Sequence, residues 1–237
     1  MITPPAFPVR PWLVAGVATL LGFLLVTVLV LGSGRSDPLD RLASVAAGSV
    51  RTTGTTEVAR IVTGFGSWPV VLAVTAVAAG FAWERTGQLR RPGTLLAVLL
   101  LTVSVVYLLK IAVGRPRPVA GLLVPSSSTG YAFPSGQTTD ATVVYVLTAL
   151  LLTTAERRVR RIVALAAAAA LALLVGLSRV YLGYHWASDV LAGWLLGAAI
   201  TAFAYAVVGS LAGPAPPPAD GPERLPSTRA ASPSPNG

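Results

Sequence analysis

Residues 162–210, IVALAAAAALALLVGLSRVYLGYHWASDVLAGWLLGAAITAFAYAVVGS, contain two long apolar segments joined by a short polar turn. Segments 162–181 and 187–210 each have the roughly 20 mostly apolar residues that an α-helix needs to cross the hydrocarbon core of a bilayer. The turn contains His185, the only histidine of the chain, and Asp189 follows at the start of the second segment. This stretch therefore predicts two consecutive membrane helices with a polar turn at one membrane surface.

The whole chain has the composition of an integral membrane protein. Hydrophobic residues make up 54% and charged residues 11% of its 237 positions, against roughly 25% charged residues in a soluble domain, and the mean hydropathy is +0.71. We expect an all-α fold, a polytopic membrane helix bundle with six transmembrane helices. The fourth span is the weakest, because Thr138, Thr139 and Asp140 stand at its start. The predicted spans are residues 11–32, 61–82, 94–113, 138–154, 162–181 and 187–210.

Arginine placement predicts the orientation of these spans, because short loops rich in Arg and Lys remain in the cytoplasm. The connections between spans two and three and between spans four and five are rich in arginine, which puts both termini in the cytoplasm. The 33–60 loop, although it also contains arginines, is then outside, together with the 114–137 loop and the 178–189 turn. The cytoplasmic arginines are Arg85, Arg90, Arg91, Arg157, Arg158, Arg160 and Arg161.

The two ends of the chain differ in character. The first span is too long and too uniformly apolar for a cleaved signal peptide, so we expect it to be retained. Residues 213–237 are rich in proline, alanine, serine and glycine, which predicts a disordered cytoplasmic tail. The expected organisation is a membrane domain over residues 1–212 followed by this tail.

Composition also excludes several classes of site. The chain has no cysteine, one histidine and few acidic residues, so we expect no disulfide, no thiolate and no protein-bound zinc or di-iron centre. The net charge is +9, but no basic cluster is interleaved with aromatic residues as a nucleic-acid surface requires. We therefore expect membrane lipids, and no nucleic acid, as partners.

Three short polar motifs lie on the predicted outer face: K-x6-RP over residues 110–118, PSG at 134–136, and SR-x5-H-x3-D over 178–189. Considered singly, each has an ordinary explanation. Lys110, the only lysine, could place its amine among lipid headgroups at the end of a span, and the loop arginines could touch lipid phosphates. The PSG motif is typical of a helix start, and His185 alone could be an interfacial packing residue.

Together, the three motifs supply the donors that bind a phosphate. Guanidinium groups bind oxyanions bidentately, and Lys110, Arg117 and Arg179 provide the positive charge. Ser135 and the backbone N–H groups around Gly136 lie at a helix start, where the helix dipole favours an anion. Glycine at this position lets a phosphate come close to the main chain.

His185 and Asp189 suggest a nucleophile with an orienting partner. Their spacing of four places both side chains on one face of a helical turn. A carboxylate there can hold one ring nitrogen and leave the other free to attack phosphorus. Such a site needs no metal.

In this order and on six spans, the motifs resemble those of the type 2 phosphatidic acid phosphatase superfamily of membrane lipid phosphatases, over about residues 95–197. The resemblance implies that His185 becomes a phosphohistidine and that Asp189 orients it. It also implies action on lipid phosphates or prenyl diphosphates at the outer membrane face, without metal or other cofactor. The residues that it implies for binding the transferring phosphoryl group are Lys110, Arg117, Ser135, Gly136 and Arg179.

Gln137 departs from this resemblance, because the family pattern has a histidine there that is taken to protonate the leaving oxygen. An amide donates a hydrogen bond but delivers no proton, so a chain that is active as written should favour diphosphates, whose phosphate leaving group has a second pKa of about 6. Asp140, one turn later, either caps and packs or, if desolvated, donates a proton instead. A third interpretation of Gln137 is an introduced substitution that silences the enzyme.

Three functional interpretations follow from the sequence. The first is a lipid phosphatase or diphosphatase in a bacterial plasma membrane, with its active site on the extracytoplasmic side. The second, favoured by Gln137, is a lipid-phosphate binding protein or a phosphotransferase with little hydrolytic activity. The third is a transporter or channel, against which stand the few ionisable groups at the centres of the spans and the expectation that no helix is broken.

Overall fold

The protein is all-α throughout the part that the computed structural model describes, residues 9–33, 37–87, 89–118, 130–153 and 157–210. The predicted tail over 213–237 and much of the 114–137 loop lie outside the described residues. The eight helices of the described ranges are α1 (Val9–Gly32), α2 (Pro38–Ser49), α3 (Thr53–Gly64), α4 (Trp68–Thr86), α5 (Arg90–Val113), α6 (Gly136–Leu152), α7 (Arg158–Tyr181) and α8 (Ala187–Ser210).

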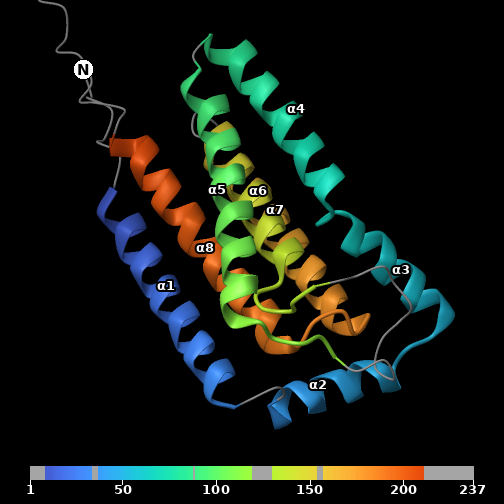
Figure 1. Cartoon of the computed structure of the whole chain (residues 1–237). Coiled ribbons are helices and arrows are strands. Elements are labelled where there is room, and N and C mark those ends of the chain that lie inside the picture. Colours follow the sequence, from blue (N-terminus) through green and yellow to red (C-terminus); the bar gives the residue numbers. More distant parts are fainter. Residues whose placement is uncertain (1–8, 34–36, 88, 119–129, 154–156, 211–237) are drawn as a thin grey trace, which may run out of the picture.

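The six longer helices run side by side as a bundle, with α2 lying across one of its ends (Figure 1). Helix α8 packs against α1 and α6, and α6 also packs against α7, α5 and α4. The buried centre between these helices is apolar and includes Leu147, Leu150 and Tyr205, with Trp12 of α1 against the Tyr205 ring at a centroid distance of 4.8 Å. The predicted helical bundle is therefore confirmed, and five of the six predicted segments agree with helix bounds to about one turn.

Glycines let α8 approach α6 very closely. A Cβ atom added to Gly193 would lie 2.9 Å from the backbone oxygen of Ser135, and one added to Gly197 would lie 2.7 Å from Cβ of Thr142. Both distances are shorter than real Cβ contacts, so only glycine fits at these positions without a shift of the helices. The first half of α8 is thereby held against the start of α6, where the PSG motif lies.

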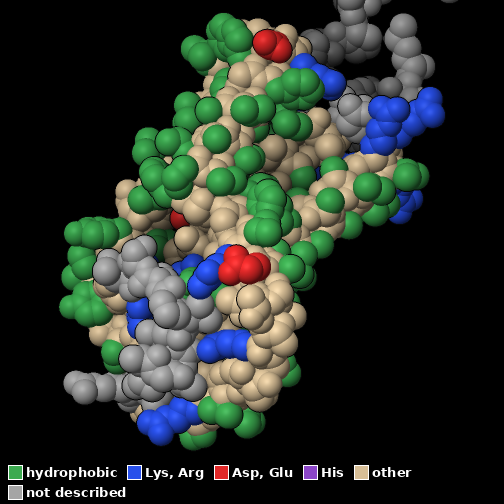
Figure 2. Space-filling model, turned by 90° about the vertical axis from the view of Figure 1, so that its right-hand side faces the viewer, with side chains coloured by type: hydrophobic (Ala, Val, Ile, Leu, Met, Phe, Trp, Pro, Cys, Tyr) green, Lys and Arg blue, Asp and Glu red, His purple; other side chains and the backbone are tan. Residues whose placement is uncertain are grey.

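Four helices, α1, α5, α7 and α8, are long and apolar enough to cross a membrane, and the bent pair α3 and α4 supplies a fifth candidate within the described ranges. The chain is thus an integral membrane protein with multiple apolar helices. In Figure 2, hydrophobic side chains cover the middle of the visible face, and Lys and Arg side chains gather toward its two ends. The segment expected as the fourth span is the 17-residue helix α6.

The predicted single span over 61–82 is wrong in one respect, because the chain breaks within it. Helix α3 ends at Gly64, α4 begins at Trp68, and the two are bent by 46°. Gly66 in the break packs so tightly that an added Cβ would lie 2.7 Å from Val175 of α7. Ser67 then serves as the N-cap of α4, with a proline in its first turn, and proline is well suited to start a helix. The expectation that no helix is broken therefore fails here.

The 33–60 segment, expected as a loop, forms α2 and α3. Asp37 caps α2 by accepting a hydrogen bond from the N–H of Leu39. Thr52 and Thr55 form a reciprocal capping box at the start of α3. These two helices bring polar residues of the first connection to the end of the bundle where the motifs lie (Figure 1).

The two ends of the bundle have different chemistry. At one end, Arg90 donates to the carbonyl oxygen of Val208 and Arg91 donates to that of Leu151 at 3.1 Å. These contacts join the start of α5 to the last turns of α8 and α6. The other end gathers the end of α5, the start of α6, the end of α7 and the start of α8 (Figure 1). The three motifs therefore share the end that is remote from these arginines.

Candidate active site

The candidate site is built from the ends of four helices and the turn between the last two. The described residues of all three motifs meet there, as the sequence predicted. Lys110 lies in the last turn of α5, Ser135, Gly136 and Gln137 start α6, Arg179 lies in the last turn of α7, His185 lies in the α7–α8 turn, Asp189 lies in the first turn of α8, and Arg117 follows α5 in an irregular segment.

The turn after α7 positions His185. Gly183 adopts a φ of +73°, a left-handed conformation that suits glycine and reverses the chain at the helix end. The N–H groups of Tyr184 and His185 then donate to the carbonyl oxygen of Arg179 at 3.0 and 3.3 Å. The imidazole is buried as a result, with Nε2 toward Arg117 and Nδ1 toward Asp189.

The neighbours of His185 define its protonation state. Burial, together with the positive charges of Arg179, Arg117 and Lys110, holds the pKa of His185 well below its ordinary value of 6.5. Arg117 Nη1 lies 3.2 Å from Nε2 of His185. Because a guanidinium only donates, Nε2 must be the unprotonated acceptor, and the single ring proton is on Nδ1. The ring thus has an unprotonated electron pair on Nε2, which accepts the hydrogen bond from Arg117; this is the nitrogen that a nucleophile would use.

Asp189 lies beside the imidazole and is completely buried. Its Oδ2 is 3.4 Å from Nδ1 of His185, longer than an ordinary hydrogen bond. The same oxygen accepts from the N–H of Trp186 at 2.9 Å, and the backbone oxygen of Asp189 accepts from the N–H of Ser135 at 3.0 Å. His185 and Asp189 therefore lie next to each other, and Asp189 is joined directly to the start of α6.

Asp189 also forms a buried ion pair with Arg115, which the sequence did not predict. Arg115 donates through Nη1 to Oδ1 of Asp189 and through Nη2 to Oδ2 of Asp40, both at 2.6 Å. Asp40, from α2, also accepts from the N–H and hydroxyl of Ser188 at 2.8 and 2.6 Å. Arg115 was visible in the sequence as a second arginine beside Arg117, whereas nothing near Asp40 indicated that it would be buried.

Three cations surround the imidazole. Lys110 donates through Nζ to the backbone oxygen of Tyr131 at 2.7 Å. Arg117 donates to the backbone oxygens of Gly130 and Tyr184 at 3.0 and 2.6 Å, and burial lowers the pKa of its guanidinium. Arg179 lies over the ring of Tyr184, at 4.6 Å from the centroid. These contacts fix the orientation of positive groups around one histidine, an arrangement that suits a phosphate.

Arg179 has one buried donor atom that is not hydrogen-bonded to any described residue. Arg179 is 5% exposed, and its buried Nε has no hydrogen-bond partner among the described residues. A buried guanidinium N–H without an acceptor is costly unless a ligand supplies one. A bound oxyanion would satisfy this atom.

The start of α6 contributes Ser135 and Gly136. Ser135 is completely buried, and its hydroxyl is 2.8 Å from that of Thr138 rather than capping the helix. A Cβ atom added to Gly136 would lie 3.5 Å from Val106 and 3.9 Å from Cε of Lys110. The backbone of Gly136 therefore lies close to the Lys110 side chain, with room for ordinary contact.

The two residues whose roles the sequence left open lie on the same turn of α6. Oε1 of Gln137 accepts from the hydroxyl of Thr63 at 3.0 Å, and that hydroxyl accepts from Nη1 of Arg179 at 3.1 Å. Asp140 has a buried Oδ1 without a hydrogen-bond partner in the described ranges. Thr63 comes from α3 and was not predicted as a site residue, because the sequence placed α3 in a loop and a span.

Residues 91–211 of the chain match the PAP2 superfamily. The protein belongs to this family. Its similarity to phosphatidylglycerophosphatase B of Bacillus subtilis (strain 168) is 39% identity over 95 residues, which are 38% of this chain and 44% of that relative. The alignment thus spans less than half of the relative's length.

Two solved structures are also similar to this chain. The crystal structure of the first transmembrane PAP2 type phosphatidylglycerolphosphate phosphatase from Bacillus subtilis has a TM-score of 0.73 and 25% identity, covering 80% of this chain and 94% of that one. Aquifex aeolicus LpxE has a TM-score of 0.57 and 22% identity, covering 72% of this chain and 97% of that one. The second similarity concerns the fold alone.

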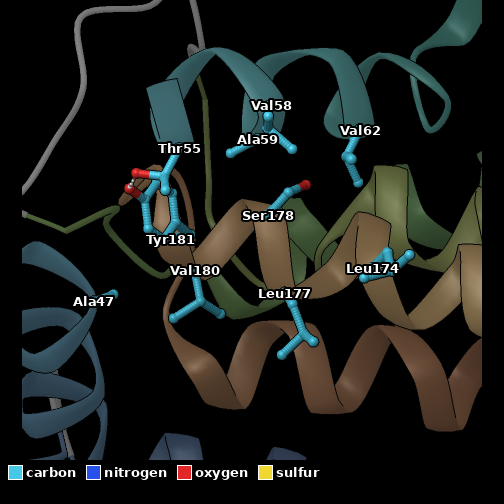
Figure 3. A pocket seen from close by; sticks show the side chains of 10 residues that line it. All are labelled: Ala47, Thr55, Val58, Ala59, Val62, Leu174, Leu177, Ser178, Val180 and Tyr181. Atoms are coloured by element: carbon cyan, nitrogen blue, oxygen red, sulfur yellow. Dashed lines mark hydrogen bonds between the residues drawn. The ribbon is translucent and has the colours of Figure 1, made fainter. Parts of the chain in front are cut away.

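An apolar pocket lies beside the site of this PAP2 protein, between α3 and α7, with a volume of about 380 Å³ (Figure 3). Val58, Ala59 and Val62 of α3 face Ser178 of α7 across it, and Thr55 meets Tyr181 at one end (Figure 3). Val62 and Ser178 immediately precede the site residues Thr63 and Arg179 in the chain. The lining residues are Ala47, Thr55, Val58, Ala59, Val62, Leu174, Leu177, Ser178, Val180 and Tyr181.

Metal-binding side chains do not gather in the part of this PAP2 chain that the structure describes. Within those ranges, no group of three or more His, Cys, Asp or Glu side chains could hold a metal ion. The polar groups around His185 are instead mainly cationic or backbone donors, which bind anions.

Proposed function

We propose that this PAP2 protein removes a phosphoryl group from a lipid phosphate or a prenyl diphosphate through a phosphohistidine at His185. The observation that carries the proposal is the contact of Nε2 with Arg117 and of Nδ1 with Asp189, at 3.2 and 3.4 Å. These two neighbours favour the tautomer whose Nε2 electron pair is available for attack on phosphorus.

The reaction then has two steps. In the first, Nε2 of His185 forms a bond to phosphorus while the bond to the leaving oxygen breaks, and Asp189 stabilises the positive charge that develops on the ring. In the second, water attacks phosphorus, the N–P bond breaks, and inorganic phosphate and the neutral imidazole are released. No step requires a metal ion.

The phosphoryl oxygens are bound by the cationic and N–H donors around His185. Lys110, Arg117 and Arg179 offset the negative charge. The α6 N-terminus, which begins at Gly136 after the N-cap Ser135, adds backbone N–H groups of its first turn and the positive end of the helix dipole. The unpartnered Nε of Arg179 supports this assignment, because an oxyanion would complete its hydrogen bonding. Asp140 remains an accessory candidate, with capping or packing as its simpler role.

Gln137 makes diphosphates the favoured substrates. Its amide supplies no proton to the leaving oxygen, and an alkoxide leaving from a monoester resembles water, with a pKa of about 15.7. A phosphate leaving from a diphosphate, with a second pKa of about 6, needs little acid assistance. The apolar pocket between α3 and α7 is suited to the hydrocarbon chain of such a lipid.

In the membrane, we propose six spans, formed by α1, α4, α5, α6, α7 and α8, with both termini in the cytoplasm and a cytoplasmic tail over 213–237 after a domain of residues 1–212. The arginines at the end of the bundle remote from the site support this orientation. The active site then faces the extracytoplasmic side of a bacterial plasma membrane.

A second candidate function is a lipid-phosphate binding protein or phosphotransferase with little hydrolytic activity. Gln137 favours it, because loss of general acid assistance typically costs a factor of about 10²–10⁴ in rate. The phosphate-binding groups would be retained in such a protein, since binding alone requires them.

Phosphate release from a panel of lipid mono- and diphosphates tests these proposals, with phosphatidylglycerol phosphate included because the relatives carry its name. The chain, Gln137→His and His185→Ala are compared. We expect release by the chain and by Gln137→His, and none by His185→Ala. Activity of Gln137→His alone would support the binding function, inertness of both would reject hydrolysis, and activity of His185→Ala would reject the nucleophile.

A further inference from the structure

The hydroxyl of Thr63 forms hydrogen bonds with two residues of the site, Arg179 and Gln137, which lie on different helices. Nη1 of Arg179 lies 3.1 Å from Oγ1 of Thr63, and Oγ1 of Thr63 lies 3.0 Å from Oε1 of Gln137. Thr63 belongs to α3, Arg179 to α7 and Gln137 to α6, so one hydroxyl connects three helices.

The direction of these hydrogen bonds follows from which donors and acceptors the guanidinium, the hydroxyl and the amide possess. A guanidinium only donates, so the Thr63 hydroxyl accepts from Arg179. The single proton of the hydroxyl then points to Gln137, which accepts it through its carbonyl oxygen. The amide nitrogen of Gln137 is left with two N–H donors, and no hydrogen-bond partner for them lies in the described part of the chain.

The break between α3 and α4 holds Thr63 in this position. A Cβ atom added to Gly66 would lie 3.0 Å from both Cβ and the backbone oxygen of Gln137, so the main chain of the break rests directly on Gln137. Tyr145 of α6 donates through its hydroxyl to the backbone oxygen of Phe65 at 2.7 Å. The end of α3 is therefore fixed on α6 at two points besides the Thr63 hydroxyl.

We infer that Thr63 orients the side chain of Gln137 so that its amide N–H groups are presented to the phosphoryl group of the substrate. This inference rests on the proposed function for the location of that group. Gln137 then acts as a neutral hydrogen-bond donor, which stabilises negative charge on a phosphoryl or leaving oxygen without transferring a proton. Thr63 is a positioning residue that acts through Gln137.

A double-mutant cycle on phosphate binding tests this coupling. The full-length protein in detergent is titrated with inorganic phosphate by calorimetry, using Thr63→Val, Gln137→Met and the double variant. Both single changes should weaken binding. In each background, the loss of phosphate affinity caused by Thr63→Val is measured. This loss should be about fivefold larger in the unchanged chain than in the Gln137→Met background, a factor typical of one oriented hydrogen bond. Thr63→Ser keeps the hydroxyl and should therefore retain most of the coupling between this position and Gln137.

Gln137→Met removes both N–H donors without adding charge, so its loss of phosphate affinity tests the donor role. Gln137→Glu keeps an acceptor for the Thr63 hydroxyl but has no N–H group and adds a negative charge, so for both reasons it should bind phosphate more weakly than Gln137→Met does. Thr53→Val, an exposed change on the same helix, controls for general effects on α3, and thermal unfolding verifies that each variant is folded. If Thr63→Val does not fold, full phosphate affinity in Gln137→Met or in Gln137→Glu still contradicts the inference, because both variants lack the N–H donors.

The outcomes separate this inference from the proposed hydrolysis. Coupling in phosphate affinity without phosphate release from any lipid would support the positioning role and reject the hydrolytic function. Phosphate release without coupling, or full phosphate affinity in Gln137→Glu, would overturn the positioning role and leave hydrolysis standing.

Discussion

The guanidinium of Arg115 and the carboxylate of Asp189 form a buried ion pair, with Nη1 2.6 Å from Oδ1. The other nitrogen of the same guanidinium pairs with Asp40 of α2 at the same distance. Arg115 therefore forms ion pairs with two buried carboxylates, one of which faces the imidazole of His185. The stability of the end of the bundle and the orientation of the proposed nucleophile depend on the same side chain.

Arg115→Met should destabilise the protein and abolish phosphate release. The change leaves Asp40 and Asp189 buried without their cation, and breaking a buried pair typically costs about 3–5 kcal/mol. Thermal unfolding in detergent and phosphate release measure the two effects. Arg60→Met is the matched control, because Arg60 pairs with Glu57 at 2.9 Å on the exposed side of α3 and such pairs contribute about 1 kcal/mol or less. Equal stability of the two variants would contradict a structural role for Arg115.

The long helices and the meeting of the three motifs could be predicted because their signals are local. Apolar runs of about 20 residues define helices without knowledge of their neighbours, and the His185–Asp189 spacing is a property of one helical turn. The long helices accordingly lie within about a turn of their expected bounds, except at the break after α3. There the apolar run continues through Phe65 and Gly66, and hydropathy does not detect a bend that packing produces.

The contacts that complete the site could not be predicted, because their partners are far apart in the chain. Arg115 and Asp40 are separated by 75 residues, and Gln137 and Thr63 by 74. Asp40 in the expected loop and Thr63 at the start of the expected second span have the same local pattern whether they face solvent, lipid or a buried arginine. Only the packing of α2 and α3 against the end of the bundle distinguishes these cases.

Protein stability should fall below pH 6.5 because of His185. Burial, aided by Arg179, Arg117 and Lys110, keeps the pKa of His185 well below 6.5 in the folded protein, whereas the unfolded chain takes up its imidazole proton near a pKa of about 6.5. The unfolded state thus binds more protons in this range, and the free energy of unfolding should fall by up to about 1.4 kcal/mol per pH unit as the pH drops below about 6.5.

Comparison of the chain with His185→Gln between about pH 5 and pH 7.5 isolates this effect, because the chain has a single histidine. Unfolding free energies in detergent should show a steeper decrease toward acid for the histidine form. Parallel curves would mean that the imidazole takes up its proton over the same pH range in the folded and unfolded states, in conflict with a folded-state pKa held well below 6.5.

Gln137→His should increase the hydrolysis of monophosphate lipids far more than that of diphosphate lipids. An imidazole can protonate the leaving oxygen, which is typically worth a factor of about 10²–10⁴ for a poor leaving group, whereas a departing phosphate needs little assistance. The ratio of kcat/KM for a prenyl diphosphate to that for phosphatidic acid measures the difference. Gln137→Asn retains an amide and should show no such gain. An equal gain on both substrates would show that leaving-group protonation is not what Gln137 lacks.

Gly193→Ala should separate α8 from α6 and reduce both activity and stability. The new methyl group would lie 2.9 Å from the backbone oxygen of Ser135 and 3.0 Å from Cβ of Thr138, and because backbone lies on one side, relief requires movement of a helix. Overpacking of this kind typically costs about 1–3 kcal/mol. The movement would also strain the hydrogen bond from the N–H of Ser135 to the backbone oxygen of Asp189, which joins the two halves of the site.

Gly80→Ala is the control for this substitution. Gly80 lies within α4, is exposed, and has no atom within 4 Å of an added Cβ, so alanine there should leave activity unchanged and stabilise the helix by up to about 1 kcal/mol. Thermal unfolding and phosphate release of the two variants are measured together. A Gly193→Ala protein that matches Gly80→Ala in both assays would show that α6 and α8 can separate without disturbing His185, and the close approach of these helices would then have no part in holding the site.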